Sequence, residues 1–189
     1  EVLQKSGRLD KIQIFFSCDA LGREGEYVRT GLDLSVAIKN FEYILHNTPF
    51  DQGINSALTV TAVPGMPAMV KYINECNKIK PIYWSMMKAN QHEIGPREYM
   101  YPGIFGNKIN TWGLREAVES FDTTSHGNPD SVKETYKTYM KGIMTEFDKR
   151  EPSLLRQKQF KIYLNELDRR RATDWKSVYP QIWEEVKNL

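Results

Sequence analysis

Apolar residues near the start of the chain form one short run and then a periodic stripe. Residues 12–16 (IQIFF) are followed by Ser17 and Asp19, which predicts a buried strand that ends in a loop. Residues 34–45 carry apolar side chains at the i, i+3, i+4, i+7 spacing of an amphipathic helix. Asp33 stands where it can cap the first free N–H groups of that helix.

The same pattern of strand and helix recurs further along the chain. Residues 47–53 (NTPFDQG) have the composition of a loop, and residues 57–63 (ALTVTAV) are rich in β-branched side chains, which predicts a second strand. Residues 66–76 place apolar side chains on one helical face, and residues 81–87 (PIYWSMM) predict a third strand. Strands that alternate with helices form βαβ units with parallel strands and right-handed crossovers. The predicted class is α/β, as a piece of either a barrel or an open doubly wound sheet.

The middle of the chain has no such periodicity. Residues 88–128 combine many glycines and prolines with interleaved aromatic residues. A long segment of this kind is usually functional or disordered, and its aromatic content argues against disorder. Within it, residues 111–121 predict a short helix.

The last third of the chain is predicted to be helical. Residues 131–188 show helical apolar stripes, with one helix expected over residues 154–167 and a last one that carries residues 178–186. We therefore divide the chain into an α/β part, residues 1–128, and a helical C-terminal extension, residues 129–189.

The amino-acid composition argues against some classes of partner but does not indicate a function. Of the 189 residues, 40% are hydrophobic and 26% are charged, as in a soluble globular protein. The formal net charge of +2 gives no bulk reason to expect a nucleic-acid or anionic-membrane partner. No apolar stretch approaches the roughly 20 residues that span a bilayer, and the first residues, EVLQKSGRLD, are too polar for a signal peptide.

The cysteines point to a compartment and exclude some metal motifs. Cys18 and Cys76 belong to no CxxC pair, which excludes a zinc knuckle and a thioredoxin-like motif. Lone cysteines without a secretory signal favour a reducing, cytoplasmic setting, and we expect both to be buried apolar residues. Because the chain begins with Glu1 rather than Met, we expect the natural N-terminus to be missing.

The stretch FFSCDALGREGEYVRTGLD, residues 15–33, is the main candidate for a site. Ser17 and Asp19 follow the first predicted strand, and parallel α/β folds bind ligands at the carboxyl ends of their strands. A hydroxyl and a carboxylate there can hydrogen-bond a ribose or an amine, and Arg29 can form a charge-assisted fork to a carboxylate or phosphate. In the alternative interpretation, Ser17 and Asp19 only satisfy backbone groups in the loop, and Arg29 pairs with Glu24 or Glu26. The glycines do not form GxGxxG, so the usual dinucleotide fold is not indicated.

Residues 17–45, SCDALGREGEYVRTGLDLSVAIKNFEYIL, resemble the fourth strand, loop and helix of radical S-adenosylmethionine (SAM) enzymes. The resemblance is closest to the branch with SPASM or twitch auxiliary-cluster segments. The matching residues are Ser17, Asp19, Gly22, Glu26, Tyr27, Arg29, Gly31 and Asn40. ALTVTAVPGMPAMVKYI resembles the fifth strand and its helix, and PIYWSMMKAN with YPGIF resembles the sixth strand and its loop. FKIYLNELDRRRATDWKSVYPQIWEEV is similar to the C-terminal helices, so the resemblance covers nearly all of the chain.

The resemblance implies a fold, two cofactors and a set of contacts. The chain would be the C-terminal part of a partial (β/α)6 TIM-like barrel, followed by a helical extension. The family binds a [4Fe-4S] cluster and SAM, and it cleaves SAM to a 5′-deoxyadenosyl radical that abstracts hydrogen from a substrate. By this resemblance, Ser17 and Arg29 contact the aminoacyl or ribose part of SAM, and Asp19 lies beside it. Thr61 and Val63, at the end of the next strand, line the adenine side.

The sequence departs from the family at the iron-sulfur cluster. The CxxxCxxC loop is absent, and two lone cysteines cannot replace it, so this chain alone forms no cluster. We expect either the C-terminal half of a longer radical SAM enzyme, not competent alone, or a degenerate relative that serves as a non-catalytic α/β binding or scaffold domain. The substrate is unknown, although the aromatic segment of residues 88–128 suggests a peptide-like or sizeable organic group. The oligomeric state is open.

Two further groups of residues have both a functional and a structural interpretation. A His92/Glu93 pair is either a base over the substrate or a surface pair. The arginine run 169–171 either binds phosphate or pairs with Glu166 and Asp168 at a helix C-terminus, where cations are favoured. The histidines have no ligand spacing, and no metal ligand set is expected in this chain.

Overall fold

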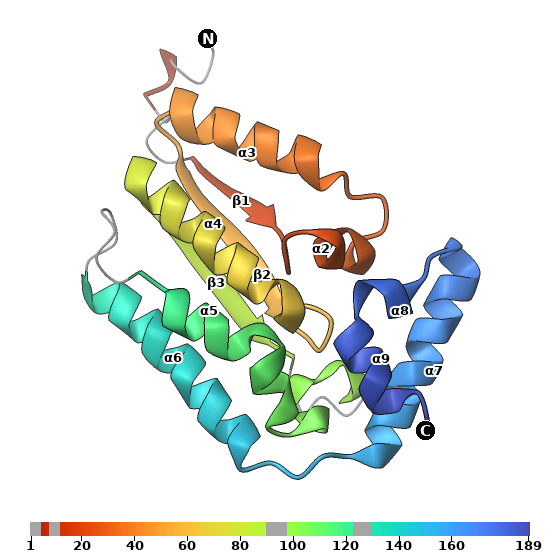
Figure 1. Cartoon of the computed structure of the whole chain (residues 1–189). Coiled ribbons are helices and arrows are strands. Elements are labelled where there is room, and N and C mark those ends of the chain that lie inside the picture. The colour runs from red at the N-terminus through yellow and green to blue at the C-terminus, as the bar shows by residue number, and fades with distance from the viewer. Residues whose placement is uncertain (1–4, 8–11, 90–97, 123–129) are drawn as a thin grey trace.

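A parallel sheet organises the N-terminal half of the protein. The computed structural model describes residues 5–7, 12–89, 98–122 and 130–189. Within these ranges the strands are β1 (Gln13–Ser17), β2 (Asp51–Leu58) and β3 (Ile82–Lys88), hydrogen-bonded in the order β1-β2-β3 (Figure 1). Both pairs are parallel, which confirms the predicted α/β class. The first and third strands lie within one residue of their predicted bounds.

The second strand begins earlier than the hydrophobic pattern predicts. The strand predicted over residues 57–63 and the loop predicted over 47–53 are wrong in their bounds, because β2 is the polar stretch DQGINSAL and the chain leaves the sheet after Leu58. The β-branched residues that follow form a turn instead. Val60 and Val63 in this turn are fully buried, so these apolar side chains pack in the core although they lie outside the sheet.

A glycine explains why the polar stretch can be the central strand. Phe15, Gly53 and Tyr83 stand side by side in the register. A Cβ atom at Gly53 would lie 2.5 Å from the Phe15 ring and 2.8 Å from the Tyr83 carbonyl oxygen. The close approach of the neighbours therefore requires glycine at this position.

Helices connect the strands as the periodicity predicts. The connecting elements are α2 (Arg23–Val28), α3 (Leu34–Asn47), the 3-10 turn η2 (Val63–Gly65) and α4 (Met66–Ile79). Asp33 accepts a hydrogen bond from the Val36 N–H at 3.1 Å, which confirms the predicted cap of α3. Pro67 lies in the first turn of α4, where its missing N–H breaks no helical hydrogen bond.

The described part of the aromatic segment folds into short turns. They are η3 (Glu98–Met100), η4 (Pro102–Phe105), the π-helical turn η5 (Asn110–Leu114) and α5 (Arg115–Ser120). The helix predicted over residues 111–121 is present but is broken at Gly113, whose φ is 149°. A Cβ atom there would lie 2.5 Å from the Val63 carbonyl oxygen, so the break lets this segment contact the turn after β2.

Four helices form the C-terminal part of the protein. They are α6 (Asp130–Asp148), α7 (Leu154–Arg171), α8 (Trp175–Val178) and α9 (Pro180–Val186). α7 continues four residues beyond its predicted end and stops at Ala172, which adopts a left-handed φ of 53°. The predicted last helix is in fact two, because Tyr179 has non-helical dihedral angles before Pro180. Among the helices of the described ranges, none combines the length and the apolar composition that a bilayer-spanning segment requires.

Among the described residues, helices cover one face of the sheet and leave side chains of the other face exposed. Figure 1 shows α3, α4, α5 and α6 in a row on one side of the strands. Along β3, Trp84 is buried beneath this layer, whereas Tyr83 and Met87 on the other face are 47% and 72% exposed. Phe15 of β1 shares the open face and is 43% exposed. Parallel sheets are normally covered on both faces.

An apolar core joins the sheet to the C-terminal helices. Phe160 of α7 lies edge-on against Phe105, at 5.9 Å between ring centroids, and against Trp175, at 6.4 Å. All three residues belong to the same core cluster as the residues of the sheet. The domain boundary predicted between residues 128 and 129 lies next to residues outside the described ranges, and it stays a prediction.

Candidate functional site

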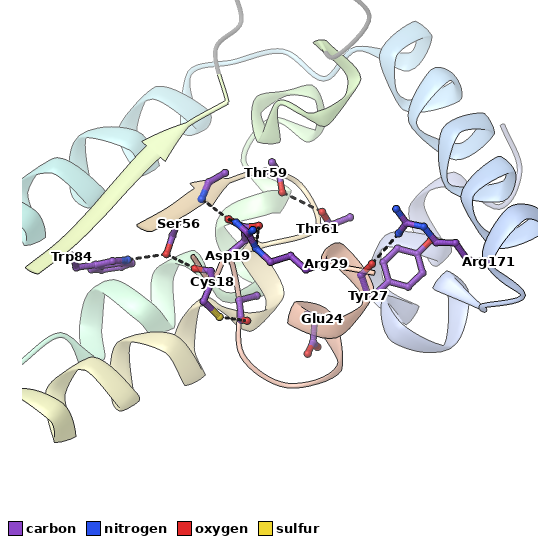
Figure 2. A network of polar contacts seen from close by, with 12 residues as sticks. Cys18, Asp19, Glu24, Tyr27, Arg29, Ser56, Thr59, Thr61, Trp84 and Arg171 are labelled. Carbon is purple, nitrogen blue, oxygen red and sulfur yellow. Dashed lines mark hydrogen bonds and ion pairs between the residues drawn. The ribbon is translucent and has the colours of Figure 1, made fainter. Parts of the chain in front are cut away.

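The candidate loop is anchored to two strands at its first residues. The Cys18 N–H donates to the Asn55 carbonyl at 2.9 Å, so the chain stays in register with β2 one residue beyond Ser17. The Ser56 hydroxyl donates to the Cys18 carbonyl at 2.6 Å and accepts from the Trp84 indole N–H at 3.0 Å (Figure 2). The loop therefore starts from a fixed point at the carboxyl end of β1.

Asp19 and Arg29 form the polar centre of the loop. Arg29 Nη2 donates to Asp19 Oδ1 at 3.2 Å, and Arg29 Nε lies 3.1 Å from Asp19 Oδ2 (Figure 2). Asp19 Oδ1 also accepts from the Ala57 N–H at 2.8 Å. The Asp19 side chain is 8% exposed and that of Arg29 is 39% exposed. The carboxylate is thus paired within the protein, while the Arg29 side chain remains partly exposed.

This geometry bears on the structural interpretation of the loop. Asp19 does accept from a backbone N–H, but from that of Ala57 on β2 rather than from one within the loop. The predicted pairing of Arg29 with a glutamate of its own loop is wrong, because Arg29 pairs with Asp19. Glu26 instead accepts from the Leu34 N–H at 3.2 Å and so supports the start of α3. A buried carboxylate attracts the nearest cation more strongly than an exposed one does.

Two glycines allow the loop to fold back tightly. Gly22 precedes α2 with a φ of 80°, a conformation that favours glycine. A Cβ atom at Gly25 would lie 2.1 Å from the Ala20 carbonyl oxygen, and the approach of these backbones brings α2 over the end of β1. The glycines of GREG therefore shape the loop that carries Arg29.

The other predicted contact residues differ in their exposure. Ser17 is exposed at the end of β1, on the open face of the sheet. Thr61 is 2% exposed, and its hydroxyl lies 3.1 Å from that of Thr59 (Figure 2). Val63 is fully buried, so its side chain presents no surface to a ligand. Because β2 ends at Leu58, both Thr61 and Val63 stand in the turn beyond the strand.

The cysteines are buried, as predicted. Cys18 and Cys76 are free thiols in the core. Burial raises the pKa of both thiols to about 11, with Asp19 adding to the effect at Cys18. Thiols with this pKa are protonated at neutral pH and are poor metal ligands. Across the described part of the chain, no group of three or more His, Cys, Asp or Glu side chains is placed to hold a metal ion. The His92/Glu93 pair lies outside the described residues.

Sequence reasoning missed a contact between the loop and the end of α7. The Tyr27 hydroxyl donates to Asp168 Oδ1 at 3.0 Å. Arg171 Nη1 donates to the Tyr27 carbonyl at 3.2 Å, as Figure 2 shows. Burial and the hydrogen bond to Asp168 raise the pKa of Tyr27, which keeps its hydroxyl protonated. The two residues are 141 positions apart, so no local pattern reveals the contact.

Two arginines of the run 169–171 form ion pairs within the last turns of α7. Arg169 and Arg170 both pair with Glu166, at 2.8 and 2.7 Å, which agrees with the structural interpretation. The expected pairing with Asp168 is wrong, since the Asp168 carboxylate accepts from Tyr27 and from the Trp175 N–H.

Two cavities lie beside α7 in the described part of the protein. The one bounded by Tyr27, Thr61 and Arg171 has a volume of about 50 Å³. A water needs roughly 10–15 Å³ of such space, so this cavity has room for a few water molecules. The other, of about 250 Å³, lies at the start of α7, where Arg156 pairs with Glu98. Neither cavity is lined by Asp19 or Arg29.

Comparison with known proteins supplies no relative. The chain matches no protein-family model, no curated protein and no solved structure. The chemistry of the site follows from its own residues: a buried carboxylate orients a guanidinium that is partly exposed. Such a guanidinium can bind an anionic group through charge-assisted hydrogen bonds.

Proposed function

We propose that the chain is the C-terminal part of a radical SAM catalytic domain, and that its Asp19–Arg29 loop binds the aminoacyl end of SAM. The observation that carries the proposal is that Ser17, Asp19 and Arg29 gather at the carboxyl end of β1. This is the end at which parallel α/β sheets bind their ligands. The sequence of the loop, which resembles the radical SAM pattern, supplies the identity of the ligand.

The residues of the loop suit the polar groups of SAM. The outer edge of the Arg29 guanidinium suits the SAM carboxylate, because a planar fork binds carboxylates well. Asp19 holds Arg29 in place and is itself fixed by the Ala57 N–H. The exposed hydroxyl of Ser17 suits a ribose or an amino group. Thr61 contributes to the turn beside the loop, and Val63, which is buried, is left out of the contact set.

The open face of the sheet supports the barrel form of the proposal. In the described sheet β1 is an edge strand, and the apolar side chains of Phe15 on β1 and of Tyr83 and Met87 on β3 are exposed on one face. In a partial (β/α)6 barrel, further strands curve round and enclose this face. We propose that such strands, outside this chain, pair with the free edge of β1.

The iron-sulfur cluster does not fit the residues of this chain. Cluster iron needs thiolates, and both cysteines here are buried and protonated at neutral pH. We therefore propose that this chain binds and orients SAM and that the cluster ligands come from outside it. In radical SAM enzymes, SAM and the cluster together supply hydrogen abstraction. The substrate class proposed remains a peptide-like or sizeable organic molecule.

One observation favours a second candidate, a non-catalytic α/β binding or scaffold domain. Both Asp19 oxygens already have partners within the protein, as a purely structural loop requires. The two candidates differ in whether the outer edge of Arg29 contacts a ligand.

Calorimetric titration of the protein that carries this chain separates the candidates. Arg29→Lys keeps a cation beside Asp19 but loses the outer fork, so we expect its Kd for SAM to rise about tenfold, which is about 1.4 kcal/mol. The Kd for 5′-methylthioadenosine, which has the nucleoside but no carboxylate, should not change. Arg115→Lys, an exposed arginine on α5, is the matched control and should behave as wild type. Absence of SAM binding by the wild-type protein, or wild-type affinity in Arg29→Lys, would favour the scaffold.

A further inference from the structure

The short helix that leads to Arg29 is held by the far end of the chain. α2 has six residues, and isolated helices shorter than about 12 residues are marginal in water. Its external contacts therefore decide its position. At its start, Arg23 Nη2 donates to the Ser177 hydroxyl at 3.1 Å, and the Tyr179 hydroxyl donates to the Glu24 carbonyl at 3.2 Å.

The end of α2 is held from the last turn of α7. The Tyr27 hydroxyl donates to Asp168, and its carbonyl accepts from Arg171. The Tyr27 ring lies edge-on to Tyr179, with centroids 5.4 Å apart. We call Asp168, Arg171, Ser177 and Tyr179 the C-terminal clamp. Figure 1 shows α8 beside α2, at the end of the sheet toward which the β1 arrow points.

Asp168 connects the clamp to the turn that follows α7. Its Oδ1 accepts from Tyr27 and from the Thr173 hydroxyl, at 3.0 and 2.7 Å. Its Oδ2 accepts from the Trp175 N–H at 2.8 Å, and its carbonyl accepts from the N–H of Ala172, the left-handed residue at the end of α7. One side chain thus fixes the turn into α8 and the end of α2 together.

Arg29 follows directly from the helix that the clamp holds. It is the C-terminal cap residue of α2, and its N–H donates to the Gly25 carbonyl at 3.1 Å. A shift of α2 therefore moves the start of the Arg29 side chain. We propose that Asp168 is a positioning residue for Arg29, and that it acts through Tyr27 to aim the guanidinium at the ligand carboxylate. The identity of that ligand rests on the proposed function above.

Two variants and one control test the clamp. Tyr27→Phe keeps the ring and removes only the hydroxyl that donates to Asp168. Asp168→Ala removes this hydrogen bond and also the bonds from the Thr173 hydroxyl and the Trp175 N–H, which hold the turn between α7 and α8. Glu116→Ala is the control, because Glu116 lies on α5, outside α2 and the clamp, and its carboxylate pairs with Lys71 at 3.1 Å. Thermal unfolding sets a temperature at which all four proteins are folded.

The first measurement is amide hydrogen exchange of peptides that cover residues 20–32, without any ligand. We expect exchange to be several-fold faster in Tyr27→Phe and Asp168→Ala and unchanged in Glu116→Ala. Wild-type exchange in both clamp variants would overturn the proposal, and this result does not depend on what the loop binds.

The second measurement is the Kd for SAM and for 5′-methylthioadenosine in the intact protein. Misplacement of Arg29 should raise the Kd for SAM about fivefold to tenfold and leave the Kd for 5′-methylthioadenosine unchanged. An equal rise in Kd for both compounds would mean that Asp168 has a general structural role, and it would overturn the proposed positioning role. If the wild-type protein binds no SAM while exchange is faster in the clamp variants, the proposed function fails and the link from Asp168 to the Arg29 loop stands.

Discussion

Asp19 determines the geometry of the loop, because a carboxylate with 8% of its side chain exposed requires partners that replace water. It has two, the guanidinium of Arg29 and the N–H of Ala57. The former lies ten residues along the chain and the latter on the neighbouring strand. The same side chain thus closes the loop upon itself and ties it to the sheet.

A double-mutant cycle measures the interaction free energy between Asp19 and Arg29. We expect Asp19→Ala, Arg29→Ala and the double variant to give a coupling free energy of about 1–2 kcal/mol in urea unfolding, below the value of a fully buried pair because Arg29 is 39% exposed. The control cycle is Lys71–Glu116, whose side chains are 64% and 60% exposed at 3.1 Å. Its coupling should be at most about 0.5 kcal/mol. Equal coupling in the two cycles would contradict a special role for Asp19.

At the level of elements, Glu146 joins three parts of the fold. This residue of α6 accepts hydrogen bonds from Lys88, at the end of β3, and from the Tyr101 hydroxyl, just before η4. Burial acts to raise the pKa of Glu146, but the hydrogen bonds from Lys88 and Tyr101 outweigh it and hold the pKa below its ordinary value of 4.5. A carboxyl whose pKa is lowered on folding stabilises the protein above its unfolded pKa, and this contribution is lost as pH falls through its folded pKa.

Glu146→Gln should therefore destabilise the protein in a pH-dependent way. We expect the difference in free energy of unfolding from wild type to be full near neutral pH and to shrink below about pH 4. Urea unfolding between pH 3 and pH 7, at about one-unit steps, measures it. Glu75→Gln removes an exposed partner of Lys78 and should show a small, flat difference. A Glu146→Gln deficit that persists unchanged at pH 3 would contradict the ionic role.

The helices were easier to predict than the central strand for a physical reason. α3 and α4 each bury one face, so periodicity reveals them, and Asp33 marks the start of α3. β2 is the middle strand, yet its sequence is polar and includes Gly53, which only the neighbouring strands explain. At the site, the position of Asp19 and Arg29 near a strand end was predictable. Their mutual pairing and the contact of Tyr27 with Asp168 are tertiary facts that a single sequence does not contain.

At the scale of the whole molecule, two features bear on the proposed enzyme: the exposed face of the sheet and the C-terminal clamp. Phe15 and Met87 are exposed on a face that a parallel sheet normally covers, which suits strands supplied from outside this chain. Beyond the carboxyl ends of the strands, α7 and α8 hold the loop that carries Arg29. In the proposed enzyme, the candidate SAM site would therefore lie between a barrel wall and a clamp.

Amide hydrogen exchange of the intact protein with and without SAM tests most directly whether the ligand binds at this loop. We predict that SAM slows exchange in peptides that cover residues 17–31 and leaves peptides from the middle of α6 and α7 unchanged. Slower exchange confined to another part of the protein, or no change at saturating SAM, would contradict the assignment of the SAM site to the Asp19–Arg29 loop.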